Sequence, residues 1–299
     1  MITKLAPQLV NTHLIKDILK RVDVSIILED GRRVDTLLIY LPSFNGRTNH
    51  PEFFDMISKE LLHHFALTCQ DIERKIKRKG EQAASILFDK ALSKLSQQTA
   101  HGELGELILF TLVDVYLEAP KLLSKVSLKT SPQMPVFGAD GVHIQYVDNK
   151  VRIYLGESKL YTTFTQAATK AANSIQKAKA KYLDEFNLID TYLDLPQLDD
   201  DAEEELLNIL DPFENTNIED HIHSPCFIGF ADQKLIEDNA VNDDFIQCYI
   251  KLAFNHISDY YNKLEKKGVD ITTSTLMILP FSNVDELVSE FITHLGIKK

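Results

Sequence analysis

The hydrophobic pattern of the first third of the chain predicts a small α+β region. Apolar runs at residues 23–42 flank a Glu-Asp-Gly turn, which indicates a β-hairpin. From residue 51 to about residue 95, apolar positions recur at helical spacing instead. We place this region at residues 1–98.

The rest of the chain alternates between helix-like and strand-like segments. The pattern predicts helices at about 100–117, 164–182, 243–266 and 284–295, a hairpin within 136–159, and strands at 225–232 and 275–281. Such alternation is typical of an α/β (α+β) fold, with a mixed sheet flanked by helices. We therefore expect a core at residues 99–299, interrupted by an acidic insertion at about 184–220.

The hairpin within FGADGVHIQYVDNKVRIYLGESKLY brings polar residues together. Asp148 and Asn149 favour a two-residue turn, so the numbers of paired residues should sum to 297. Asp140 then lies opposite Glu157, with Cβ atoms about 5 Å apart. Lys159 follows two residues later and points to the same face of the strand.

Two carboxylates at this separation repel each other unless they share a proton or a cation, so the hairpin predicts a divalent metal site. The alternative is an ordinary hairpin with charged surface residues at its open end. An E-x-K triplet alone is weak evidence, because Glu73 to Lys75 and Glu265 to Lys267 also form one. Those two triplets lie in charged helical stretches, where we expect solvent-exposed side chains.

A third carboxylate is predicted on the helix at about 100–117. This helix is apolar nearly all round, so it should lie within the core, and burying the Glu106 carboxylate is costly without a cation or hydrogen bonds. Glu103 lies three residues earlier on the same face. The alternative is that both acids only complement the N-terminal end of the helix dipole.

Charge and composition narrow the possible functions. The 299 residues carry a net charge of −12, which argues against nucleic acid, but residues 184–232 contain 15 Asp or Glu and no Lys or Arg. The remaining residues therefore sum to +3, which is compatible with phosphate binding. We expect the acidic stretch to be a solvated insertion, or a segment that docks on a basic partner or screens a DNA path.

The sequence does not favour a secreted protein, a membrane protein or a nucleotide-binding enzyme. Three widely spaced cysteines, no signal-peptide pattern and no apolar run near the roughly 18 residues of a membrane span favour a cytoplasmic protein. The chain has no phosphate-binding loop, dinucleotide-binding or nucleophile-elbow motif. We therefore expect no membrane and no nucleotide cofactor of its own.

These motifs carry a family resemblance. A helix bearing Glu, an Asp that opens a hairpin, and Glu-x-Lys on the return strand resemble the PD-(D/E)xK nuclease superfamily, with GAD in place of PD. The combination of GELGE, FGADGVHI and YLGESKLY is similar to the HamA family, the nuclease subunits of the Hachiman anti-phage defence system. The resemblance implies a restriction-endonuclease-like core.

The resemblance also implies roles for single residues. Asp140, Glu157 and the main-chain carbonyl of Ser158 would hold Mg²⁺, for which Mn²⁺ would substitute, and Glu106 would complete the shell or bind a second ion. Lys159 would orient the attacking water and offset charge on the phosphorane. The resemblance also makes Gln166 a candidate contact to the site or to DNA. Lys170, on the same lysine-rich helix, is a candidate phosphate contact, and Glu103 is a candidate contact to the site. For Gln166 and Lys170 the alternative is a solvent-exposed helix face.

The implied partners are DNA and a HamB-like helicase subunit that restrains the nuclease and delivers DNA to it. Two other interpretations stay open on the sequence: a nuclease fold that serves as a catalytically silent scaffold or DNA-binding subunit, and a nuclease that acts on RNA. An intact Asp140, Glu157 and Lys159 set argues against the scaffold.

Overall fold

The computed structural model describes residues 6–44, 47–131, 138–147, 150–183, 207–208, 218–238 and 243–298. Two of the sequence-based predictions concern residues outside these ranges. The turn formed by Asp148 and Asn149 lies outside the described residues, as does most of the acidic insertion expected at 184–220.

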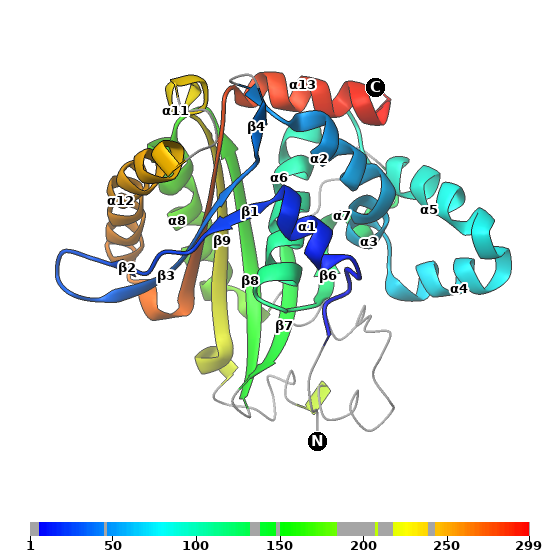
Figure 1. The fold of residues 1–299 in the computed structure, drawn as a ribbon. Helices are drawn as coiled ribbons and strands as arrows, with labels where there is room; N and C mark the ends of the chain where they lie inside the picture. The colour runs from blue at the N-terminus through cyan, green and yellow to red at the C-terminus, as the bar shows by residue number, and fades with distance from the viewer. Residues whose placement is uncertain are drawn as a thin grey trace.

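A mixed sheet forms the centre of the fold (Figure 1). In the described part of the chain it has eight strands, in the order β1-β3-β10-β9-β8-β7-β6, with β2 paired to β3. The pairs among β3, β10, β9 and β8 are parallel, and the others are antiparallel. The strands are β1 (Lys20–Val22), β2 (Ile26–Ile27), β3 (Arg33–Tyr40), β6 (Lys121–Ser124), β7 (Gly141–Val147), β8 (Lys150–Tyr161), β9 (Ile222–Ala231) and β10 (Ser274–Phe281).

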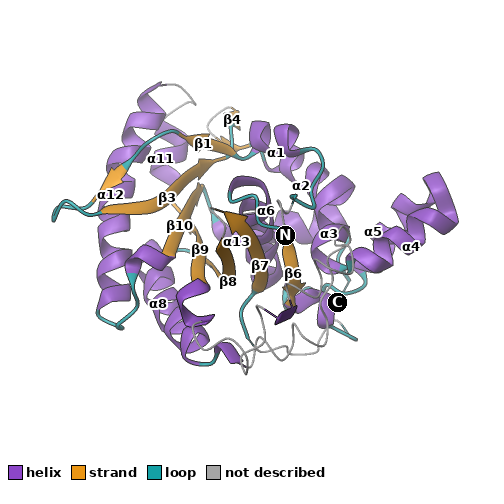
Figure 2. Ribbon diagram, turned by 90° about the horizontal axis from the view of Figure 1, so that it is seen from below, coloured by secondary structure: helices purple, strands orange, loops and turns teal. Residues whose placement is uncertain are grey.

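Helices cover both faces of this sheet, as Figure 2 shows. One face packs against α8 (Phe164–Ala180) and α12 (Asp243–Glu265), and the other against α6 (Ala100–Tyr116) and α13 (Val284–Leu295). Central parallel strands that are covered on both faces need nearly continuous apolar sequence, which explains the buried runs of β9 and β10. The mixed α/β architecture expected from the sequence is confirmed.

The first hundred residues add helices on the α6 side of the sheet. They form α1 (Thr12–Ile18), α2 (His50–Met56), a π-helical turn (Ile57–Leu61), α3 (Leu62–Ala66), α4 (Cys69–Lys79), a 3-10 turn (Gly80–Gln82) and α5 (Ala83–Leu92), with a small hairpin of β4 (Ser43–Phe44) and β5 (Arg47–Thr48). In Figures 1 and 2, α4 and α5 project from the body as an arm.

The N-terminal and C-terminal parts of the chain share one sheet. Asp35 on β3 pairs in parallel with Thr275 on β10, and one hydrophobic cluster extends from Leu9 to Ile297. The domain boundary at residue 98 stays a prediction, but the two regions on either side of it are joined by main-chain pairing and by a common core.

The predicted hairpin register is confirmed. Val142 pairs with Leu155 and Ile144 with Ile153, as the sum of 297 requires. The helices expected near 100–117, 164–182, 243–266 and 284–295 and the other two strands also form. The short elements that were not expected from the pattern include α1, β4, β5, β6, α7 (Lys125–Leu128) and α11 (Gln233–Asp238).

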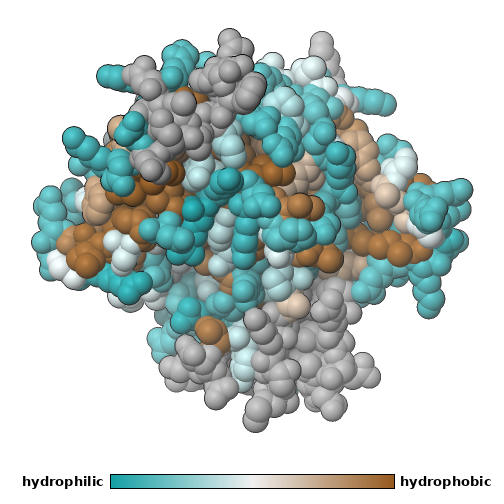
Figure 3. All heavy atoms as spheres, viewed as in Figure 1, coloured by the Kyte–Doolittle hydropathy of each residue, from teal (hydrophilic) through white to brown (hydrophobic). Residues whose placement is uncertain are grey.

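The surface is mixed in character. Figure 3 shows hydrophilic side chains over much of one face, including the outer part of the arm, with hydrophobic patches between them. Within the described ranges, no helix has the length and hydrophobicity that crossing a membrane requires.

Candidate active site

Asp140 lies immediately before β7 and is held by three neighbours. Its backbone N–H donates to the carbonyl of Gly156 at 2.9 Å. Its Oδ2 accepts hydrogen bonds from the backbone N–H of Ser158 at 2.7 Å and from the Ser158 hydroxyl at 2.9 Å. Its Oδ1 lies 2.8 Å from Nζ of Lys125. The hairpin therefore fixes both the backbone and the side chain of this aspartate.

Glu157 and Lys159 meet on the neighbouring strand β8. The ammonium of Lys159 donates to Glu157 Oε1, and also to the carbonyl of Ser158 at 3.0 Å. Burial, together with the negative charge of Asp140, raises the pKa of Glu157 to about 7. Burial by itself would lower the pKa of Lys159, but the charges of Glu157 and Asp140 outweigh it and raise that pKa. The predicted trio is therefore brought together.

Glu106 on α6 adds a third carboxylate to this charge cluster. Burial raises its pKa to about 8, and the charge of Asp140 contributes to the shift. Its Oε2 atom is buried and has no hydrogen-bond partner. α6 comes close to β8 here because Gly105 has no side chain: a Cβ atom at Gly105 would lie 3.3 Å from the Ser158 hydroxyl oxygen.

Glu103, one turn earlier on α6, has partners of its own. Its Oε1 accepts from Nζ of Lys129 at 2.5 Å and from the Thr99 hydroxyl at 2.6 Å. Its Oε2 is buried without a hydrogen-bond partner. Glu103 is thus part of a buried ion pair beside the site and does more than complement the helix dipole.

Lys125 and Lys129 are the site residues that sequence reasoning missed. Both come from the segment around α7, which begins with a capping box between Ser124 and Ser127. Burial acts to lower the pKa of Lys125, but the Asp140 carboxylate outweighs it and raises that pKa. The sequence signal for them was two lysines four residues apart in SKVSLK, which ends eleven residues before Asp140.

Gln166 and Lys170 lie on α8 with exposed side chains. Among the described residues, no hydrogen bond or ion pair links either of them to Asp140, Glu157 or Lys159. Their contacts with the site or with DNA stay predictions.

The oxygen atoms of the site are of the types that bind a hard divalent cation. Carboxylate oxygens of Asp140, Glu157 and Glu106 and the carbonyl oxygen of Ser158 are the ligand types that Mg²⁺ prefers, and the unpartnered Glu106 Oε2 is available for coordination. In the described part of the chain, however, no three His, Cys, Asp or Glu side chains converge closely enough to hold a metal ion. Here Lys125 and Lys159 pair with the carboxylates instead.

Comparison with known proteins agrees with the motif resemblance. A search of curated proteins gave no match. The sequence does match the HamA family over residues 13–295, which includes the sheet, both layers of helices and every candidate site residue. Because the match extends over nearly the whole chain, this protein belongs to the HamA family.

Proposed function

We propose that this protein is a metal-dependent nuclease that cleaves DNA and acts under the control of a partner helicase. Membership of the HamA family makes it a component of a Hachiman anti-phage defence system. The observation that carries the enzymatic proposal is the cluster of Asp140, Glu157 and Lys159 at one end of the β7–β8 hairpin, with Glu106 beside it.

Each side chain has a defined role in this proposal. Asp140, Glu157, Glu106 and the Ser158 carbonyl would hold Mg²⁺, which supplies charge neutralisation at the scissile phosphate and lowers the pKa of a bound water. Lys159 would orient the attacking water and stabilise the negative charge that develops on phosphorus. Ser158, through its N–H and hydroxyl, keeps Asp140 oriented.

The arm of α4 and α5 supports a path for nucleic acid toward this site. α4 carries five cations in six residues, and four of them are exposed: Arg74, Lys77, Arg78 and Lys79. At the base of the arm, Lys94 donates to the carbonyl of Ser127 at 2.6 Å and to that of Lys129 at 3.0 Å. Phosphates bound along α4 would therefore lie on an arm whose base contacts the segment that carries Lys125.

The central test is cleavage of labelled duplex DNA by the purified chain with Mg²⁺, alone and with its partner helicase. Glu157→Ala combined with Lys159→Ala should abolish cleavage, as should EDTA. Glu265→Gln combined with Lys267→Met alters an E-x-K triplet whose Glu pairs with Arg32 at the surface, and should leave cleavage unchanged. Cleavage that survives both EDTA and the Glu157/Lys159 variant rules out the proposed mechanism.

The same purified proteins also distinguish a DNA nuclease from the two alternatives, an RNA nuclease and a catalytically silent scaffold. Parallel digests of single-stranded DNA, duplex DNA and RNA identify the nucleic acid that is cut. If calorimetry shows no Mn²⁺ binding that depends on Asp140, and no substrate is cut, the chain is a scaffold and not an enzyme. Helicase control predicts that nicking by the isolated chain and by the complex differs in rate and in its response to ATP.

A further inference from the structure

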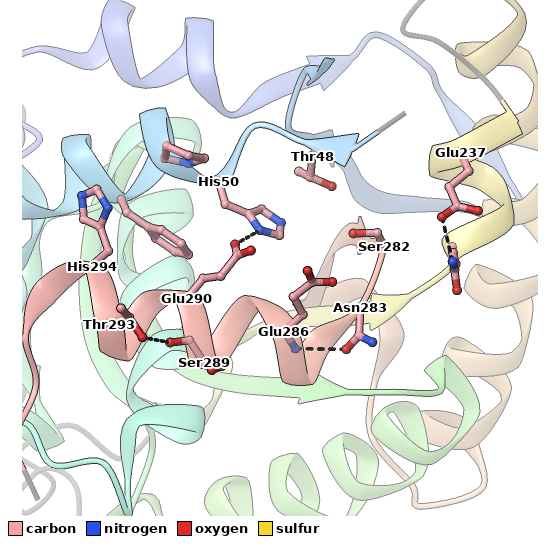
Figure 4. A pocket seen from close by; sticks show the side chains of 13 residues that line it. Thr48, His50, Glu237, Ser282, Asn283, Glu286, Ser289, Glu290, Thr293 and His294 are labelled. Atoms are coloured by element: carbon pink, nitrogen blue, oxygen red, sulfur yellow. Dashed lines mark hydrogen bonds and ion pairs between the residues drawn. The ribbon is translucent and has the colours of Figure 1, made fainter. Parts of the chain in front are cut away.

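A pocket lies away from the carboxylate cluster. Its volume is about 580 Å³, and it is bounded by α2, α11, α13 and the end of β5 (Figure 4). None of Asp140, Glu157, Lys159 or Glu106 lines it. Nothing in the proposed nuclease mechanism uses this pocket.

The pocket contains a buried histidine with one unused nitrogen. The side chain of His50 is 6% exposed, and its Nδ1 lies 2.6 Å from Glu290 Oε2. Because a carboxylate can only accept, Nδ1 carries the proton, and in a neutral ring Nε2 is then a hydrogen-bond acceptor. This Nε2 atom is buried without a partner, and Figure 4 shows the ring extending into the pocket from α2. With the ring neutral, a ligand that reaches Nε2 must donate a hydrogen bond.

A second polar atom and the lining charges restrict the ligand further. The hydroxyl of Thr48, which is 6% exposed, is also buried without a partner. Three carboxylates line the pocket, from Glu237, Glu286 and Glu290, and no lysine or arginine is among the described residues of its wall. The walls therefore favour a cation, and the buried acceptor favours one that carries N–H groups.

We propose that this pocket binds a guanidinium group. A guanidinium is a planar cation with five N–H donors and no acceptor, so one group can donate to His50 Nε2 and to a carboxylate such as Glu286 at the same time. An alkali or alkaline-earth cation prefers oxygen ligands and would leave Nε2 without a suitable partner. The guanidinium comes either from a free small molecule or from an arginine side chain of a partner polypeptide, and the two sources share this chemistry.

Calorimetry on the full chain tests the proposal with two probes, agmatine and the capped tripeptide acetyl-Gly-Arg-Gly-amide. At least one should bind in a 1:1 ratio. Glu286→Gln should weaken that binding about tenfold, the loss of one charge-assisted hydrogen bond. Asp285→Asn is the matched control, because it removes the same charge from the same first turn of α13 but does not line the pocket, so binding should be unchanged.

A neutral probe and a second variant complete the test. The tripeptide with citrulline in place of arginine keeps the shape but loses the charge, and should not bind measurably. Thr48→Val and His50→Asn should each weaken binding, with thermal melting as the check on folding. Tighter binding of agmatine identifies a small-molecule site, and tighter binding of the arginine peptide identifies a polypeptide partner.

Three results would overturn the proposal: no saturation by either probe up to about 10 mM, equal affinity in Glu286→Gln and the unaltered protein, or equal binding of the citrulline peptide. None of them depends on nuclease activity, so the test is independent of the proposed function.

Discussion

Lys125 Nζ lies 2.8 Å from Asp140 Oδ1, so a lysine on a four-residue helix neutralises the aspartate that opens the hairpin. Both side chains are largely buried, at 19% and 9% exposed. The same carboxylate is a proposed ligand of the catalytic metal ion. An ammonium and a divalent cation therefore compete for one oxygen atom.

This competition predicts the effect of removing the lysine. Lys125→Met keeps the length of the side chain but frees Asp140 Oδ1, so Mn²⁺ should bind more tightly, by about tenfold for one charge-assisted hydrogen bond. Titration calorimetry measures the affinity. Lys129→Met is the control, because Lys129 pairs with Glu103 and should produce a smaller change. Unchanged or weaker Mn²⁺ binding in Lys125→Met contradicts the competition.

Two glycines on α6 give a matched pair for the packing of this helix against β8. A Cβ atom at Gly102 meets nothing within 4 Å, so Gly102→Ala should stabilise the protein by about 0.5–1 kcal/mol through lower backbone entropy in the unfolded chain. A Cβ atom at Gly105 lies 3.3 Å from the Ser158 hydroxyl. Gly105→Ala should therefore be less stable than Gly102→Ala by about 1–2 kcal/mol.

Urea denaturation measures both free energies of unfolding. Gly105→Ala should also slow DNA cleavage, because it moves Glu106 and Ser158 apart, whereas Gly102→Ala should not. Equal stability of the two variants would mean that α6 shifts freely on β8.

The buried His143 predicts how stability depends on pH. Its Nδ1 lies 2.8 Å from the carbonyl of Ala119, and burial lowers its pKa from 6.5 to about 4. Between these two values the unfolded chain binds the proton that the folded protein excludes. The stabilising contribution is thus complete above pH 6.5 and is lost as the pH falls toward 4, at about 1.4 kcal/mol per pH unit.

His143→Asn tests this assignment, since an asparagine amide can donate to the same carbonyl without titrating. Its free energy of unfolding should decline less steeply than that of the unaltered protein between pH 6.5 and pH 4. The decline should not disappear, because burial also lowers the pKa of His64 to about 3 and of His223 to about 4. Parallel curves would assign the acid sensitivity to other groups.

The cationic arm predicts a salt-dependent term in DNA affinity. Replacing Lys77, Arg78 and Lys79 by Gln should weaken duplex binding and reduce the slope of log affinity against log salt concentration by about 2–3, since each phosphate contact contributes about 0.9. Fluorescence anisotropy in EDTA measures binding without cleavage.

The control is a second triple variant that removes three positive charges from a different surface. Lys251, Lys266 and Lys267 are exposed at or just beyond α12, across the sheet from the arm, and their replacement by Gln should leave the slope nearly unchanged. If the slope of log affinity against log salt concentration fell equally in both triple variants, DNA affinity would depend only on the net charge of the protein.

Local sequence rules accounted for the core of the candidate site. The two-residue period of a strand and the Asp-Asn turn were sufficient to predict the register of β7 and β8, and with it the meeting of Asp140 and Glu157. Glu106 was expected on a buried helix, and its carboxylate does lie in the charge cluster.

What the sequence did not reveal depends on contacts between distant segments. α7 is too short for a hydrophobic period, so nothing local placed Lys125 next to Asp140. The parallel pairing of β3 with β10 joins segments that alternation alone cannot order. His50 gave no signal either, because its partner Glu290 lies far along the chain.

The pairing of Asp35 with Thr275 connects positions 240 residues apart. It therefore determines when during synthesis the central sheet can be completed. While the ribosome is still adding residues, β3 has no parallel neighbour, and β9 lacks the strand that covers its other edge. The finished sheet must wait until Phe281 has been synthesised. A growing chain therefore has unpaired strand edges for most of its synthesis, and such edges favour aggregation. The same delay means that a truncated product ending before β10 lacks the strand that joins the two ends of the fold.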